Sequence, residues 1–172
     1  MTDNFTKNTT KKNEDLTIII PTKDRKLHVN RWLSYANEIN FPYKLFIADG
    51  AKDNAMLDFF SKTERFPNVN YEYVKFPFDK SYNEMWLKLY ESLKQVKTKY
   101  VVIGNDDDLF CTSGLTKSLD FMKNNPDFSS CGGRIGTFSL DSFTPTNLYI
   151  YHSINPLPES VTDESSLNRV KQ

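Results

Sequence analysis

Short apolar runs that alternate with amphipathic segments constrain the fold of this chain more than any other feature. Four runs rich in β-branched or aromatic residues are bounded by Pro, Gly, Asp or Asn, which is typical of buried strands. They cover residues 16–20, 44–48, 69–73 and 100–103. Apolar residues recur at helical spacing between or after these runs, within residues 28–39, 53–60, 81–96 and 115–122. A further strand-like segment covers residues 128–140.

Strands that alternate with helices of this length indicate βαβ units, and therefore an α/β fold with a mainly parallel sheet. In such sheets, ligands bind beyond the carboxyl ends of the strands. That rule places three segments on one edge of the sheet, residues 21–25, 49–50 and 105–108.

The segment at 81–96 has the clearest helix signals. Ser81 and Glu84 form an S-x-x-E capping box at its start. Its apolar residues predict a buried stripe, and tryptophans and methionines in the helices are expected in the core. The stripe consists of Tyr82, Met85, Trp86, Leu89, Leu93 and Val96.

Composition excludes several classes of protein. The 172 residues carry 22 basic and 22 acidic side chains, so no overall field recruits nucleic acid or an anionic membrane. The apolar runs are far too short to cross a bilayer, and the polar N-terminus lacks the apolar region of a signal peptide. Cys111 and Cys131 lack metal-ligand spacing and suggest a reduced, cytoplasmic pair.

Three adjacent carboxylates, Asp106, Asp107 and Asp108, follow the fourth apolar run directly. At about 4 Å, like charges repel by roughly 4 kcal/mol near a protein surface. A solvated loop that caps the next helix is one explanation. The other is a divalent cation, Mg²⁺ or Mn²⁺, which takes one or two carboxylates together with phosphate oxygens.

Other polar residues at the same edge have similar alternatives. Asp49 is either a turn residue before Gly50 or an acceptor for a base N–H or a ribose hydroxyl. Arg25 and Lys23 suit a diphosphate, although solvation is the usual role of such side chains. Lys80, which precedes the capped helix, is a weaker phosphate candidate. Fingerprints of dinucleotide-binding and P-loop proteins are absent from the sequence.

With these residues placed, the sequence resembles nucleotide-diphospho-sugar glycosyltransferases of the GT-A fold, in particular the inverting class called glycosyltransferase family two. "LTIIIPTKDR" resembles the opening strand of that family, and "LFIADGA" resembles its second strand. "YVVIGNDDDLF" resembles the fourth strand with its D-x-D element, and "NPDFSSCGGRI" resembles the segment after the next helix. The likeness covers about residues 16–140.

The resemblance implies a Rossmann-like αβα sandwich that binds a nucleotide-sugar donor and Mn²⁺ or Mg²⁺. It implies that Asp49 contacts the base, that Thr22 and Arg25 lie along the nucleotide, and that Lys80 contacts phosphate. Asp106 would face the ribose or the metal, and Asp107 and Asp108 the cation. The register of the triplet leaves open which carboxylate ligates the ion.

The chain departs from the family pattern at two places. Ala48 and Ala51 replace the usual Asp and Ser around the second strand end, and Lys23-Asp24 replaces Tyr-Asn. The acceptor-side half that carries the general base has no match, so no catalytic residue is assigned. The carboxylates available there are Asp141, Glu159, Asp163 and Glu164.

These features predict a flexible polar tail at 1–15, a nucleotide-sugar-binding domain at 16–140, and an incomplete acceptor-side segment or extension at 141–172. The leading hypothesis is a metal-dependent, inverting glycosyltransferase with an unidentified saccharide, lipid-linked or protein acceptor. The second is a truncated, catalytically silent module that binds nucleotide sugar. A third is a receiver-like phosphoryl-transfer domain built on the Asp cluster.

Overall fold

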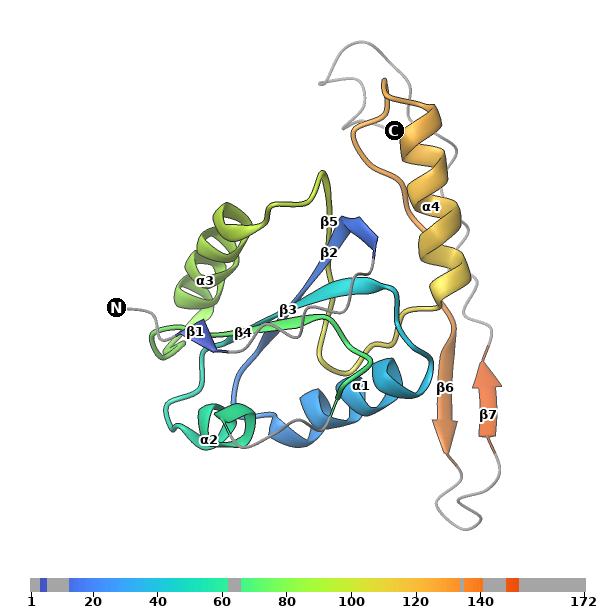
Figure 1. Ribbon diagram of the computed structural model, residues 1–172. Coiled ribbons are helices and arrows are strands. Elements are labelled where there is room, and N and C mark those ends of the chain that lie inside the picture. Colours follow the sequence, from blue (N-terminus) through green and yellow to red (C-terminus); the bar gives the residue numbers. More distant parts are fainter. Residues whose placement is uncertain (1–3, 6–12, 62–65, 134, 141–147, 152–172) are drawn as a thin grey trace. The chain divides into compact units, whose positions relative to one another are not determined.

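The structure is a computed structural model that describes residues 4–5, 13–61, 66–133, 135–140 and 148–151 (Figure 1). The chain divides into two compact units, Met1–Thr112 and Ser113–Gln172. The predicted functional boundaries at 16 and 140 are a different division, and they stay predictions.

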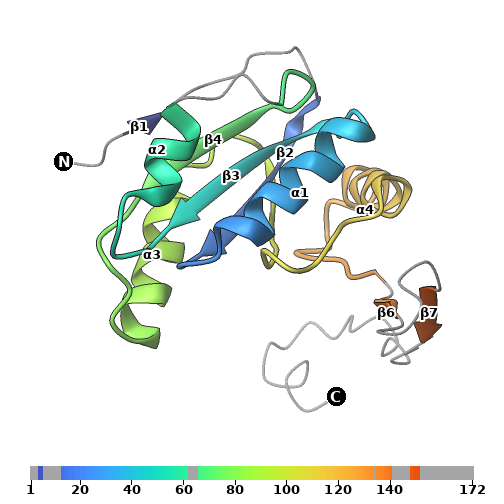
Figure 2. The same cartoon turned by 90° about the horizontal axis from the view of Figure 1, so that it is seen from below.

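The first unit is a five-stranded sheet with helices on both faces. The strands lie in the order β1-β4-β3-β2-β5; β4, β3, β2 and β5 are parallel, and β1 pairs antiparallel with β4. Helices α1 and α2 lie on one face of the sheet and α3 lies on the other (Figure 1 and Figure 2). The predicted α/β sandwich with a mainly parallel sheet is confirmed. The elements are β1 (Asn4–Phe5), β2 (Asn13–Thr22), α1 (Lys26–Glu38), β3 (Tyr43–Asp49), α2 (Ala55–Ser61), β4 (Tyr71–Lys75), α3 (Tyr82–Gln95) and β5 (Tyr100–Ile103).

The two central strands have apolar side chains on both faces because helices cover both. Ile18, Ile19 and Ile20 of β2 are fully buried, as are Leu45 and Ile47 of β3. Parallel strands covered on both faces are expected to read as continuous apolar runs. The apolar runs at 16–20 and 44–48 therefore lie in strands, as predicted.

Aromatic side chains of α1 contact Phe41 and the loop that follows β5. Trp32 is buried and meets Phe41 edge to face, with ring centroids 5.3 Å apart. Its indole N–H donates to the Asp108 carbonyl at 2.6 Å. The Tyr35 hydroxyl donates to the Phe110 carbonyl at 3.0 Å. Helix α1 thereby holds the backbone of the loop that follows β5.

Helix α3 begins as predicted but buries a different face. Ser81 is the N-cap, and its Oγ accepts from the Asn83 N–H and donates to Glu84. Half of the predicted stripe is wrong, because Tyr82, Trp86 and Leu93 are exposed, whereas Leu89 is buried as predicted. The buried residues of the helix are Lys88, Leu89 and Ser92. A lysine is buried here because its ammonium group has partners at the edge of the sheet.

Boundaries differ from the prediction at both ends of the chain. Strand β2 begins at Asn13 rather than at residue 16, and Asn4–Phe5 forms β1 within the predicted tail. Of the strand-like segment at 128–140, Thr137–Leu140 is a strand, β6. In the second unit, β6 pairs antiparallel with β7 (Leu148–Tyr151) after helix α4 (Thr112–Asn124). Within the described residues, no helix has the length and apolarity to cross a bilayer.

The exposed face of α3 gives a direct test of its orientation. Trp86→Ala should change the free energy of unfolding by less than about 0.5 kcal/mol, because the side chain is 62% exposed. Leu89→Ala should cost about 2–5 kcal/mol, since it removes a buried side chain and leaves a cavity. Urea denaturation measures both, and a larger loss at Trp86 than at Leu89 would contradict this placement.

Candidate functional site

The three predicted segments meet at the carboxyl ends of β2, β3 and β5. Thr22 is the register partner of Asp49, and the Gly50 N–H donates to the Thr22 carbonyl at 3.0 Å. Asp24, with φ 56°, lies in the left-handed region that Asp tolerates, between β2 and α1. A fourth segment joins them, because the Asp79 N–H donates to the Gly50 carbonyl at 3.0 Å.

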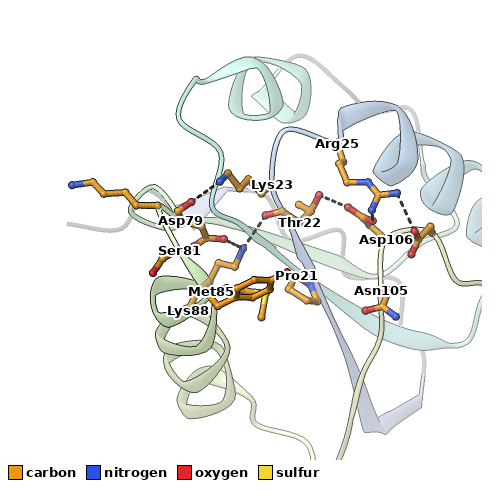
Figure 3. Close-up of a pocket in the computed structure, with 13 residues that line it drawn as sticks. Pro21, Thr22, Lys23, Arg25, Asp79, Ser81, Met85, Lys88, Asn105 and Asp106 are labelled. Carbon is orange, nitrogen blue, oxygen red and sulfur yellow. Dashed lines mark hydrogen bonds and ion pairs between the residues drawn. The ribbon is translucent and has the colours of Figure 1, made fainter.

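A cleft of about 880 Å³ opens at this edge, bounded by residues 21–25, 79–88 and 105–107 (Figure 3). Its volume is within the range of small-molecule sites. Four basic and three acidic side chains line it, namely Lys23, Arg25, Lys80, Lys88, Asp79, Asp106 and Asp107. The mixture suits a ligand that carries both negative charge and hydrogen-bond donors.

Asp106 is the one buried carboxylate of the triplet. It is buried, and its Oδ2 accepts from the Thr22 hydroxyl at 2.7 Å. Its Oδ1 lies 3.2 Å from Nη1 of Arg25. Thr22 and Arg25, from the segment at 21–25, therefore both contact Asp106, from the segment at 105–108, as expected for segments that meet at one edge of the sheet.

Arg25 also reaches Asp107, with Nη2 3.0 Å from its Oδ2. This hydrogen bond from the guanidinium, more than its charge alone, holds the pKa of the Asp107 carboxyl below its ordinary value. Asp108 is exposed and accepts from the Asn105 amide at 2.7 Å. The repulsion within the triplet is thus offset by one arginine shared between its first two members.

Across the described ranges, no three His, Cys, Asp or Glu side chains converge as metal ligands. The donor chemistry of the triplet still fits Mg²⁺ or Mn²⁺, which need one or two carboxylates plus ligand oxygens. Asp106 and Asp107 both contact Arg25, so a cation bound there would share them with the guanidinium or displace it.

Asp49 lies beneath the cleft rather than among its lining residues. Its carboxylate is fully buried and accepts from the Ala51 N–H at 2.8 Å, the Tyr73 hydroxyl at 2.7 Å and Lys75 Nζ at 3.1 Å. Burial, and then the bond to Asp49, raise the pKa of Tyr73, so the phenol stays a donor. Because Asp49 is fully buried and does not line the cleft, a base contact would require the residues around it to move.

Lys80, just before α3, and Lys23, just after β2, make different contacts. Lys80 is exposed and lines the cleft, where it is available to an anionic ligand. Lys23 donates to the Asp79 carbonyl at 2.6 Å, and its ammonium lies 4.6 Å from the centroid of the Phe78 ring. Lys23 therefore fixes the loop that carries Asp79.

Sequence reasoning missed a buried ion pair, Lys88 and Asp79. Lys88 Nζ lies 2.5 Å from Asp79 Oδ2 and donates to the Thr22 carbonyl at 2.9 Å (Figure 3). Both side chains are at most 5% exposed. The available signal was the spacing of Lys88 with Ser92 on one helical face, but the aromatic residues elsewhere on the helix masked it.

Gly50 leaves room for this pair. A Cβ atom at position 50 would lie 2.2 Å from Asp79 Oδ2 and 2.5 Å from Oδ1, far inside van der Waals contact. The carboxylate therefore packs directly against the backbone at the end of β3. Any side chain at position 50 would displace it.

Comparison with known proteins supports the fold. No protein-family model matches the chain, and no curated protein matches its sequence. Among solved structures, Staphylococcus aureus TarS matches with a TM-score of 0.51 and 16% identity over 65% of this chain and 20% of TarS. A structure of TarS 1-349 matches with the same score and identity, over 65% of this chain and 33% of that one.

TarS is a glycosyltransferase, so this chain has a glycosyltransferase-like fold. The chain spans about a fifth to a third of the TarS chains that it matches. At this identity the likeness establishes the fold and leaves the activity and family two membership to be proposed.

Removal of the buried ammonium group should be costly. Lys88→Met leaves the Asp79 charge buried without its partner, and we expect a loss of about 3–5 kcal/mol in the free energy of unfolding. The double variant Lys88→Met with Asp79→Leu should recover most of that loss, because no charge is stranded. Lys94→Met, on an exposed part of the same helix, should cost far less, because its partner Glu91 stays solvated. A loss at Lys88 no larger than at Lys94, by urea denaturation, would contradict the buried pair.

The titration of Asp107 should depend on Arg25. In Arg25→Gln, the pKa of Asp107 should rise toward its ordinary value, as measured from the carboxyl carbon shift by NMR. Since the folded-state pKa lies below the unfolded one, this contact stabilises the fold above about pH 4 and is lost as pH falls through the lowered value. Lys94→Gln should leave the Asp107 titration unchanged, and an equal shift in both variants would contradict the assignment.

Proposed function

We propose that this chain binds a nucleotide-diphosphate sugar in the cleft at the sheet edge and takes part in transfer of the sugar to an acceptor hydroxyl. One observation carries the proposal: in a glycosyltransferase-like fold, a cleft at the strand ends combines Arg25 and Lys80 with the buried Asp106. The cations suit a diphosphate, and the carboxylate suits a hydroxyl donor or a metal ion.

The proposed donor-binding residues are those predicted from the sequence. Arg25 would bind phosphate oxygens through its forked N–H groups, and Lys80 would add a point charge. Thr22 would line the nucleotide and keep Asp106 oriented, since its hydroxyl already donates to that carboxylate. The proposed base contact of Asp49 stays part of this set, with the condition that its fully buried carboxylate becomes accessible from the cleft.

We include Mg²⁺ or Mn²⁺ in the proposal, with Asp106, Asp107 and Asp108 as candidate ligands. A bound cation would supply Lewis-acid stabilisation of the departing diphosphate. In its absence, Arg25 balances the charge of Asp106 and Asp107, so that guanidinium is poised to move onto the phosphates.

In the proposed reaction, the acceptor oxygen bonds to the anomeric carbon while the bond from that carbon to the diphosphate oxygen breaks. The nucleoside diphosphate leaves with the electron pair, the configuration inverts, and the acceptor proton passes to a base. No residue is assigned as that base. Asp141, Glu159, Asp163 and Glu164 lie outside the described residues.

A nucleotide-sugar-binding module without turnover is the second candidate, and a specific observation favours it. Each acidic side chain that lines the cleft already has a cationic partner: Asp79 pairs with Lys88, and Asp106 and Asp107 pair with Arg25. A general base is more effective when its carboxylate is available to the acceptor. Release of free sugar or a glycosylated product from a panel of nucleotide sugars would favour the enzyme.

Two further parts of the proposal concern family membership and location. Membership of glycosyltransferase family two rests on the resemblance of the strand-end motifs. A cytoplasmic location rests on the two cysteines, which are exposed thiols. The balance of 22 basic and 22 acidic residues supports a nucleotide-sugar partner over a nucleic acid.

Thermal unfolding tests the proposed site. UDP, GDP or dTDP with Mn²⁺ should raise the melting temperature, and a ligand at a hundred times its Kd should add about 2.7 kcal/mol of stability. Asp106→Asn with Asp108→Asn should abolish the part of the shift that needs Mn²⁺, because two candidate ligands lose their charge.

The double variant Asp120→Asn with Asp127→Asn is the matched control. It removes two exposed carboxylates that do not line the cleft, so the ligand-induced shift should be kept. A metal-dependent shift that survives in the Asp106 and Asp108 variant would reject the proposed ligands. Absence of any shift with the wild-type chain would reject the nucleotide site.

A further inference from the structure

Asp79 has a hydrogen-bonding capacity that the folded chain leaves unused. Its Oδ2 is held by Lys88, whereas its Oδ1, which is also buried, meets no donor in the described part of the chain. A buried polar atom without a partner is costly and rare in folded proteins. Such an atom in a residue that lines a cleft is a candidate for a ligand contact.

Several contacts fix the position of Asp79. Its carboxylate packs on the backbone of Gly50, its N–H donates to the Gly50 carbonyl, and its own carbonyl accepts from Lys23. Lys88, itself anchored on the Thr22 carbonyl, places a positive charge against the Asp79 carboxylate. An ionised carboxylate is an acceptor without donor capacity.

Both carboxylate oxygens of Asp49, unlike those of Asp79, have hydrogen-bond donors within the chain. Its carboxylate accepts from three donors of the chain itself and does not line the cleft. Asp49 and Asp79 both lie beside Gly50, the first just before it in β3 and the second packed on it. An acceptor that lines the cleft is therefore available at Asp79, whereas Asp49 does not line it.

We propose that Asp79, held by Lys88 against Gly50, is the acceptor for a ring N–H of the nucleobase. This inference rests on the proposed nucleotide-sugar function and moves the base contact from Asp49 to Asp79. The terminal torsion of an Asp side chain is soft, so a small rotation of the carboxylate presents Oδ1 to the cleft. A carboxylate selects uracil, thymine or guanine, whose ring N–H donates, and disfavours cytosine, whose N3 is an acceptor.

The first experiment measures binding of UDP, CDP, 3-methyl-UDP and dUDP to the wild-type chain by calorimetry with Mn²⁺ present. UDP should bind at least about tenfold more tightly than CDP or 3-methyl-UDP, because both lack the N–H and leave the carboxylate unpaired. dUDP keeps the ring N–H and lacks only the ribose 2′-hydroxyl, so it separates a base contact from a ribose contact. Equal affinity for UDP and 3-methyl-UDP, or a loss confined to dUDP, would overturn the inference and leave the nucleotide site standing.

The second experiment assigns the contact to Asp79. Asp79→Asn should reduce the preference for UDP over CDP toward unity, because an amide can accept from uracil or donate to cytosine. Gly50→Ala should do the same while leaving the Asp79 charge in the chain, since the added Cβ displaces the carboxylate. Glu91→Gln, an exposed carboxylate of α3 outside the cleft, should keep the wild-type preference.

The outcomes separate the two proposals. If Asp49→Asn loses the preference while Asp79→Asn and Gly50→Ala keep it, the base contact belongs to Asp49 and the inference fails. If the wild-type chain binds none of the nucleotides, the proposed function fails and the inference falls with it. If Asp79→Asn does not fold, the Gly50→Ala variant and the wild-type series with 3-methyl-UDP decide the matter.

Discussion

The buried ion pair between Lys88 and Asp79 is the interaction on which the arrangement of the sheet edge depends. Lys88 comes from the middle of α3, Asp79 from the loop before that helix, and the Thr22 carbonyl, which accepts from Lys88, from the end of β2. One ammonium group thus ties a helix, a loop and a strand end together. Buried charges stabilise a protein weakly by themselves, but they are strongly destabilising when one partner is lost. The pair therefore specifies geometry more than it adds stability.

From this pair a line of polar contacts crosses the ends of β2 and β5. Lys88 contacts Thr22, the Thr22 hydroxyl donates to Asp106, and Arg25 joins Asp106 to Asp107. Every link in that line involves a charged group. A diphosphate would compete with carboxylates for Arg25, and a cation would compete with Arg25 for carboxylates. The two ligands would thus favour each other's binding, because each releases a partner that the other needs.

The sequence predicted the sheet well because parallel strands covered on both faces leave a local signature. The run at 100–103 matches β5 at both ends, and the segments at 21–25, 49–50 and 105–108 meet as parallel topology requires. Part of the buried face of α3 was predicted wrongly, because the prediction took the apolar residues at helical spacing to be the buried ones. It favoured Trp86 over Lys88, whose burial depends on Asp79 and on a carbonyl of another strand. The spacing of Lys88 and Ser92 marks a common helical face, but it does not identify these partners.

The same limit applies to the site. Thr22, Arg25 and Asp106 were predicted at one edge of the sheet, and Thr22 and Arg25 both contact Asp106. The hydrogen bonds of Asp49 with Tyr73, Lys75 and the Ala51 N–H could not be foreseen, because they depend on side chains from β4 and on the turn after β3. Asp79 resembled an ordinary loop residue before a capped helix. Its significance comes from the backbone of Gly50, 29 positions earlier, against which it packs.

The two tryptophans have an optical consequence. Trp32 is shielded and its indole N–H is bonded to the carbonyl of Asp108, whereas Trp86 stands in solvent on α3. Their fluorescence should differ in colour and in access to a dissolved quencher such as iodide. The blue, protected component comes from an indole attached to the acidic loop itself. The chain thus carries an intrinsic spectroscopic probe of that loop, with no dye attached.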